Sequence, residues 1–243
     1  MIEKAEDITY EVLKKIGNET AYTDHIHHFE ALFNIIKPKT FLEWGCGFST
    51  KLFLDASEKV ISIEIKTPAT SDVWFHQCEE LYKDYPNWTP VLYKASDEMC
   101  NACTYQCATH KDYNLIDREI QPLTSYIQEL DFLIKDLIKT QDITISFVDA
   151  NVYIRGDMAE LSLQNKIPIV VAHDFANFYP DYPSLIERQV ETGLYGWFKI
   201  KEHSDYEKIF IDYGNGTVFW ILKDYSDLIE KMKLYKNNFK AGD

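Results

Sequence analysis

Residues 40–50 read Thr-Phe-Leu-Glu-Trp-Gly-Cys-Gly-Phe-Ser-Thr, and residues 59–65 read Lys-Val-Ile-Ser-Ile-Glu-Ile. The first apolar run ends at Glu43, and a turn that contains Gly45 and Gly47 follows it. A helical pattern then leads to a second β-branched run, which ends at Glu64. The predicted order is therefore strand, glycine turn, helix and strand, the repeating unit of a parallel α/β sheet.

The glycine turn predicts a ligand site. Glycines let a backbone turn tightly and approach a ligand closely, and the N-terminus of the following helix would face that ligand. An acidic residue at the tip of the second strand, here Glu64, is placed to bind ribose hydroxyls, as in dinucleotide-binding proteins. A nicotinamide-binding turn would have a third glycine at position 50, where this chain has Thr50. The alternative is an α/β protein whose first turn merely contains two glycines.

Strand and helix patterns continue to alternate along the chain. We expect further strands at 91–95, 143–148 and 167–172, and three extended segments in the tail at 197–201, 208–212 and 217–222. We expect the other helices at 3–17, 24–36, 72–85, 122–140, 158–163 and 183–192. The pattern indicates one α/β domain, 1–243, built on a doubly wound, mostly parallel seven-stranded sheet with helices on both faces and an antiparallel C-terminal hairpin. Within it, residues 1–37 would form an N-terminal helical cap and 98–121 an insertion or lid.

Composition limits the possible partners. The chain has 243 residues, of which 46% are hydrophobic and 26% charged, as in an ordinary globular protein. Its net charge of −14 argues against binding to nucleic acid, because that requires clustered Lys and Arg. No apolar run approaches the roughly 18 residues needed to span a bilayer. The N-terminus is acidic and mixed, which is not typical of a targeting peptide, so we expect a cytoplasmic location.

The Glu-x-Gly-x-Gly-x-Ser-Thr pattern resembles motif I of class I S-adenosylmethionine (AdoMet) dependent methyltransferases. This resemblance implies a Rossmann-like methyltransferase fold and S-adenosyl-L-methionine as the cofactor. It places Glu43 near the methionine amino end, Glu64 on the ribose and Asp97 near the adenine. The cofactor-binding residues that it implies are Glu43, Gly45, Cys46, Gly47, Ser49, Thr50, Glu64, Ile65, Asp97 and Asp149.

The tips of the fourth and fifth strands, Asp149 and His173-Asp174, resemble the metal-dependent type of small-molecule O-methyltransferase. The resemblance implies catalytic roles for Asp149, His173 and Asp174, with Asp149 and Asp174 as ligands of Mg²⁺ or another divalent cation. Such an ion would hold an acceptor hydroxyl and lower its pKa. Two alternatives stay open: Asp149 contacts only the donor or caps a helix without a metal, and His173 is either a general base or a residue that orients Asp174.

Two other clusters contain possible metal ligands. Cys100, Cys103, Cys107 and His110 have spacings short enough to converge on one ion, as in a zinc knuckle or an iron–sulfur site. We expect reduced thiols in a lid segment instead. His25, His27 and His28 precede the first strand, and we expect them on a solvated helix surface.

The predicted reaction is methyl transfer from AdoMet to an oxygen of a small-molecule or sugar-like acceptor, by a single in-line displacement. Aromatic residues in the segment 177–183 would shape the acceptor pocket. One alternative keeps the fold but changes the acceptor to nitrogen or a phosphate-type oxygen. Another is a non-catalytic partner module with the same fold. The expected partner is the small-molecule acceptor, with no nucleic acid and no membrane, and a homodimer stays open.

Overall fold

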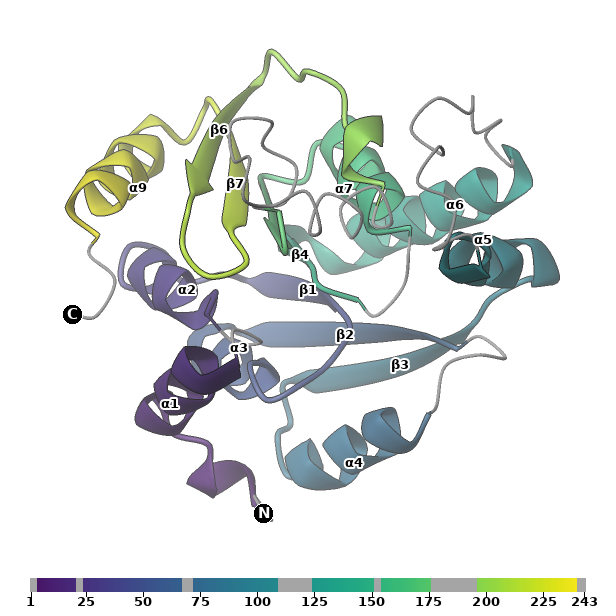
Figure 1. Ribbon diagram of the computed structural model, residues 1–243, viewed down its shortest axis with the longest axis horizontal. Coiled ribbons are helices and arrows are strands. Elements are labelled where there is room, and N and C mark those ends of the chain that lie inside the picture. Colours follow the sequence, from purple (N-terminus) through teal and green to yellow (C-terminus); the bar gives the residue numbers. More distant parts are fainter. Residues whose placement is uncertain are drawn as a thin grey trace.

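The computed structural model describes residues 4–20, 24–66, 72–108, 124–150, 154–175 and 196–239. At its centre is a seven-stranded sheet in the order β3-β2-β1-β4-β5-β7-β6 (Figure 1). The strands are β1 (Thr40–Trp44), β2 (Lys59–Lys66), β3 (Trp88–Lys94), β4 (Ile143–Val148), β5 (Ile169–His173), β6 (Tyr206–Ile211) and β7 (Thr217–Leu222). Strands β1 to β5 pair in parallel, and β7 is antiparallel to both β5 and β6. The sheet is thus the Rossmann-like methyltransferase sheet that the sequence predicts.

Helices cover both faces of this sheet (Figure 1). On one face lie α5 (Asp97–Ala108), α6 (Thr124–Gln141) and α7 (Arg155–Gln164). The other face carries η1 (Ala5–Asp7), α1 (Tyr10–Thr20), α2 (Ile26–Phe33), α3 (Thr50–Ala56), α4 (Val73–Tyr82) and α9 (Ser226–Asn238). Side chains alternate between the two hydrophobic cores, as the pleat of a strand requires: Leu42 and Trp44 face one core, and Phe41 faces the other.

The parallel strands all end at the same edge of the sheet. The chain order reverses between β1 and β4, which are neighbours in the sheet although β2 and β3 lie between them in sequence. The connections that follow β1 and β4 therefore diverge, and this opening is where doubly wound sheets bind ligands. Most of the predicted site residues lie in the last residues of these strands or just after them.

One predicted strand is absent. Residues 197–201 do not join the sheet; instead Trp197–Lys199 forms a 3₁₀ turn, η5, that follows Gly196 in the left-handed region (φ 71°). The Trp197 side chain is completely buried, and its indole N–H donates to the carbonyl oxygen of Asp174 at 3.1 Å. The apolar side chain that suggested a strand is therefore an anchor that packs beside the end of β5.

Several element boundaries also differ from the prediction. The first helix continues through Gly17, and the third strand begins earlier, at Trp88. The first part of the predicted lid, which begins at residue 98, belongs to the regular helix α5. Met99, Ala102 and Cys103 form a buried stripe along this helix. Helix α9 was not predicted; it packs through Leu228, Ile229 and Met232. The helix expected at 183–192, the aromatic segment 177–183 and residues 109–121 lie outside the described residues.

Within the described part of the chain, no helix combines the length and the apolar character needed to cross a membrane.

Candidate functional site

The two glycines of the turn after β1 have different surroundings. Gly45 has a φ of 91°, and a Cβ atom there would lie 2.8 Å from the Cα of Ala150. Because both the backbone angle and the contact exclude a side chain, Gly45 is required by the fold itself. Gly47 is not in the left-handed region, and a Cβ atom there would meet nothing within 4 Å. The protein therefore has no packing reason to keep Gly47, and its open face is available to a ligand.

The underside of the glycine loop is fixed by helix α4. The indole N–H of Trp74 donates to the carbonyl oxygen of Cys46 at 2.9 Å, and the Tyr82 hydroxyl donates to that of Gly47 at 2.9 Å. The Cys46 thiol is buried and points to Cys78. Ser49 is buried just before α3 and makes no side-chain cap bond to that helix. These hydrogen bonds from α4 thus fix the backbone of the glycine loop at the edge of the sheet.

Glu43 is the centre of a hydrogen-bond relay below this loop. Its carboxyl group is 1% exposed and accepts from the hydroxyls of Thr50 at 2.9 Å and Ser62 at 2.7 Å. The Thr50 hydroxyl accepts in turn from the backbone N–H of Gly47 at 2.9 Å, and that of Ser62 from the indole of Trp88 at 2.8 Å. Burial outweighs these hydrogen bonds and raises the pKa of Glu43 to about 8. Glu43 therefore holds the loop from within.

Glu64, by contrast, is only half-buried near the end of β2. Its carboxylate accepts from the backbone N–H of Cys46, and burial raises its pKa to about 7. The next side chain, Ile65, belongs to the hydrophobic core. Asp97 is exposed in the first turn of α5. The backbone N–H of the preceding residue, Ser96, donates to the carboxylate of Glu129 at 3.0 Å.

Asp149 and Asp174 face a common cation, as the sequence suggests, but the cation is an arginine. The Nη1 atom of Arg155, in the first turn of α7, lies 2.6 Å from Oδ2 of Asp174 and 3.2 Å from Oδ1 of Asp149. Arg155 is buried, whereas Asp149 and Asp174 keep 21% and 17% of their side chains exposed. Although burial alone would raise it, the charges of His173 and Arg155 lower the pKa of Asp174 to about 2.

His173 is buried among three carboxylates. Its Nδ1 atom lies 3.4 Å from Oδ1 of Asp149 and 3.5 Å from Oδ1 of Asp174, and its Nε2 atom contacts Asp24. Burial alone would lower the pKa of His173, but the surrounding carboxylates outweigh it and raise the pKa well above its usual value. The ring is therefore already protonated at neutral pH. Of the two roles left open, the orienting one fits this environment, since a general base must be able to accept a proton.

The same geometry tests the predicted divalent ion. An ion between Asp149 and Asp174 would share that position with the guanidinium of Arg155 and would lie beside the imidazolium of His173. Carboxylates that are already neutralised by two cations do not fit a Mg²⁺ site, which requires oxygen ligands free to surround the ion. We therefore assign no divalent ion to Asp149 and Asp174.

The expected surface position of the three early histidines is wrong. His25, His27 and His28 are all buried at the start of α2. The hydroxyl of Tyr10 in α1 hydrogen-bonds to the Nδ1 atom of His27 at 3.1 Å, and that of Tyr235 in α9 to the Nδ1 atom of His28 at 2.9 Å. These helices come from opposite ends of the chain, so no local sequence pattern shows that they cover α2.

His25 is the least satisfied of these residues. It is completely buried, and neither ring nitrogen has a hydrogen-bond partner among the described residues. Burial lowers its pKa to about 4, so the ring is neutral. Each unmet buried polar group costs about 1–3 kcal/mol. Its ring lies against that of His173, with 4.5 Å between centroids.

The cysteine segment is only partly described. Cys100 and Cys103 lie on α5 as thiols, the first half-buried and the second buried. Burial raises the pKa of Cys103 to about 12. The side chain of Cys107 and all of His110 lie outside the described residues. The expectation of reduced thiols without a bound metal therefore stays a prediction.

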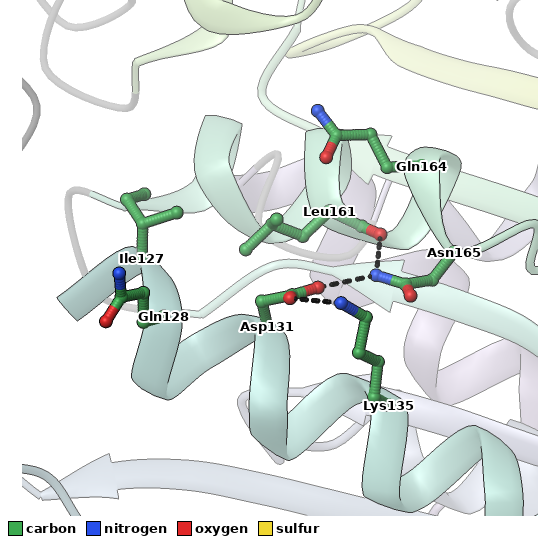
Figure 2. A pocket seen from close by; sticks show the side chains of 7 residues that line it. All are labelled: Ile127, Gln128, Asp131, Lys135, Leu161, Gln164 and Asn165. Carbon is green, nitrogen blue, oxygen red and sulfur yellow. Dashed lines mark hydrogen bonds and ion pairs between the residues drawn. The ribbon is translucent and has the colours of Figure 1, made fainter. Parts of the chain in front are cut away.

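A surface hollow lies elsewhere, between α6 and α7 (Figure 2). The carboxylate of Asp131 crosses it and accepts from the side-chain amide of Asn165 at 2.9 Å, while Lys135 pairs with the same carboxylate. The lining residues are Ile127, Gln128, Asp131, Lys135, Leu161, Gln164 and Asn165. None of these residues follows a strand end, and Asp131, Lys135 and Asn165 pair with one another, so this hollow is not the candidate site.

Comparison with known proteins gives remote likenesses. No family model and no curated protein matches the chain. Among solved structures, the S-adenosylhomocysteine-bound methyltransferase PaMTH1 of Podospora anserina matches with 13% identity and a TM-score of 0.47, over 81% of this chain and 76% of that one. A putative caffeoyl-CoA O-methyltransferase from Staphylococcus aureus matches with 14% identity and a TM-score of 0.47, over 87% and 91%. A methyltransferase from Geobacter sulfurreducens matches with 13% identity and a TM-score of 0.46, over 91% and 92%. Likeness at this distance does not carry a cofactor or a substrate from those proteins to this chain.

Proposed function

We propose that this protein is an AdoMet-dependent methyltransferase that methylates an oxygen of a small-molecule acceptor. The observation that carries the proposal is Gly47, a glycine that neither backbone angle nor packing requires, in a loop held rigid from below. A glycine at such a position is explained by a ligand that approaches the backbone too closely for a side chain.

Three strand ends would hold the donor. The half-buried carboxylate of Glu64 at the end of β2 accepts from the loop and is available to ribose hydroxyls. The open face of Gly47 would lie against the methionine part of AdoMet. Asp149, just after β4, would lie on the other side of the opening between β1 and β4. In this proposal Glu43 does not touch the donor, because its carboxyl group is buried and engaged with Thr50. Glu43 instead positions the loop that does.

The acceptor would bind at the ends of β4 and β5. With AdoMet bound, its sulfonium would supply the methyl group to the acceptor oxygen and would keep the electron pair of the broken carbon–sulfur bond. Asp149, which retains solvent access, would take up the hydroxyl proton of the acceptor. Arg155 would stabilise the developing negative charge on the oxygen, because its guanidinium is fixed beside both carboxylates.

Calorimetric titration with S-adenosylhomocysteine tests the donor half of the proposal. Glu64→Gln should weaken binding by about 1.5–3 kcal/mol through the loss of charged hydrogen bonds. Gly47→Ala should also weaken it while leaving the free energy of unfolding nearly unchanged, since the added Cβ atom enters open space. The matched control Glu80→Gln changes an exposed glutamate on α4 and should bind like the wild type. Absence of binding by the wild type at millimolar concentration would refute the proposal.

Radiolabelled AdoMet with a panel of small hydroxylated and amino compounds tests the acceptor half. We expect transfer to a hydroxyl compound, and we expect Asp149→Asn to abolish it while S-adenosylhomocysteine still binds. Transfer to amines alone would leave the donor assignment standing and show that the oxygen assignment is wrong.

A further inference from the structure

Three buried side chains meet on the side of His173 that faces away from Arg155. One ligand atom each from Asp24, His25 and His173 lies within 4.8 Å of the others. Asp24 and His25 immediately precede α2, and His173 ends β5, so segments far apart in sequence build this cluster. All three residues are buried, and their donors are two imidazoles and one carboxylate.

His25 is the observation that points to a ligand. A buried imidazole normally finds a hydrogen-bond partner, but both ring nitrogens of His25 lack one among the described residues. The ring nevertheless lies directly against His173 and next to Asp24. A buried imidazole that has a ring nitrogen without a partner, within 4.8 Å of a ligand atom of a second histidine and of a carboxylate, has the chemistry that binds a metal ion.

The groups around the cluster have the arrangement of an outer ligand shell. Metal-binding histidines usually donate their other ring N–H to a carboxylate, and metal-binding carboxylates are themselves hydrogen-bonded. The Nε2 atom of His173 faces Asp24, while its Nδ1 atom lies 3.4 Å from Asp149 and 3.5 Å from Asp174. The second oxygen of Asp24 accepts from the backbone N–H of Asn215 at 2.6 Å. His173 and Asp24 are thus each held in place by a polar group that lies outside the cluster.

Charge points the same way. Among the described residues, the carboxylates of Asp24, Asp149 and Asp174 converge around His173, and the guanidinium of Arg155 pairs with Asp149 and Asp174. No lysine or arginine of the described residues pairs with Asp24, although this carboxylate is buried. A divalent ion bound by Asp24, His25 and the neutral form of His173 would supply positive charge at that place.

We propose that Asp24, His25 and His173 bind one divalent transition-metal ion of the zinc type. Two imidazole nitrogens and one carboxylate suit Zn²⁺, Co²⁺ or Fe²⁺, whereas Mg²⁺ and Ca²⁺ prefer oxygen ligands throughout. The ion joins the start of α2 to the end of β5 and, through Asp24, to the β6–β7 turn. This assignment does not depend on the methyl transfer proposed above.

Metal analysis of the full-length protein, purified without chelator, is the first test. We expect about one zinc or iron per chain, and the metal-depleted protein should take up one equivalent of Zn²⁺ or Co²⁺ and melt at a higher temperature. X-ray absorption at the zinc edge of the loaded wild type should show two imidazole ligands and no sulfur. This measurement requires no variant, so it decides the ligand set even where a substitution prevents folding.

Variants locate the ion. His25→Gln and Asp24→Asn should each weaken Zn²⁺ binding by roughly 100-fold or more, at least the effect of losing an outer-shell partner. The matched control is His28→Gln, which removes a second buried histidine of α2 that lies outside the cluster. It should bind Zn²⁺ as the wild type does. The proposal is overturned if the wild type binds neither ion at millimolar concentration, or if His25→Gln and Asp24→Asn keep wild-type affinity.

Discussion

The two halves of the sheet edge use carboxyl groups in opposite ways. At the ends of β1 and β2, Glu43 and Glu64 are held by hydroxyl and backbone N–H groups, and burial raises their pKa values to about 8 and about 7. At the ends of β4 and β5, the pKa of Asp174 is lowered to about 2, because the charges of Arg155 and His173 outweigh its burial. The first half is held by neutral hydrogen bonds and the second by ion pairs.

The difference shows that burial raises the pKa of a carboxyl group where only neutral hydrogen bonds oppose it, and that nearby positive charges can outweigh the same burial. The two halves belong to one sheet and adjoin through the β1–β4 pair. Even so, they should respond differently to pH and to the removal of single partners. The largest effects are expected where a charge would be left without its counter-ion.

Arg155→Ala should have the largest effect on stability. It leaves Asp149 and Asp174 near one another without the guanidinium between them, and breaking a buried ion pair from one side costs about 3–5 kcal/mol. Urea unfolding would measure the loss. Arg155→Lys keeps the charge but not the planar fork, so its loss should be smaller. A loss below about 1 kcal/mol for Arg155→Ala would remove the contrast between the two halves.

Glu43→Gln should change how stability depends on pH. The pKa of Glu43 is about 8 in the folded protein against an ordinary 4.5, so the folded state holds a proton that the unfolded state has lost between these values. The wild type therefore loses stability from this group as pH rises from about 5 to 8, by about 2–4 kcal/mol. A glutamine at position 43 cannot ionise, so the free energy of unfolding of the Glu43→Gln variant should not show this loss.

Unfolding curves of both proteins across this pH range would test the effect. Glu64, His25 and His28 also have shifted pKa values, but they are present in both proteins, so the difference between the two curves isolates position 43. A difference that stays constant with pH would mean that Glu43 is not held as a neutral acid.

Gly45→Ala and Gly47→Ala should separate the two glycines. Alanine at position 45 meets both a left-handed backbone and Ala150, so it should destabilise the protein by about 1–3 kcal/mol or more. Alanine at position 47 has room and should change the free energy of unfolding by less than about 0.5 kcal/mol. Thermal unfolding of both variants gives the comparison. Equal losses would contradict the distinct roles assigned to the two glycines.

Tyr82→Phe should have a smaller effect than Gly45→Ala. It removes the hydroxyl that donates to the carbonyl oxygen of Gly47, a neutral hydrogen bond with a net contribution of about 1 kcal/mol. Tyr225→Phe, at an exposed position, is the matched control and should lie within about 0.5 kcal/mol of the wild type. If Tyr82→Phe and the control had the same free energy of unfolding, the hydrogen bond from Tyr82 to Gly47 would make no contribution to stability.

The fold and the first half of the edge could be predicted because their signals are local. Glu43, Gly45, Gly47 and Glu64 lie within one strand–turn–helix–strand unit, where spacing alone fixes which residues share an edge. Even there, the sequence does not show that Glu43 is covered, because its hydroxyl partner Ser62 comes from the neighbouring strand.

The second half depends on contacts that sequence spacing does not reveal. Arg155 was not predicted, although a signal exists: it is one of only three arginines in the chain and follows Asp149 closely. His25 was expected at the surface, because α2 alone gives no sign that α1 and α9 will cover it. Its contact with His173 joins residues far apart in the chain, which only the folded structure brings together.

The hydrogen bond from Trp74 to the glycine loop also provides a fluorescent probe within the protein. The indole of Trp74 is hydrogen-bonded to the carbonyl oxygen of Cys46, and its side chain remains 40% exposed. Any ligand that settles on the loop therefore alters the surroundings of a fluorophore already attached to it. Emission from Trp74, compared with that of a Trp74→Phe variant, would report occupancy of the loop in real time without any added label.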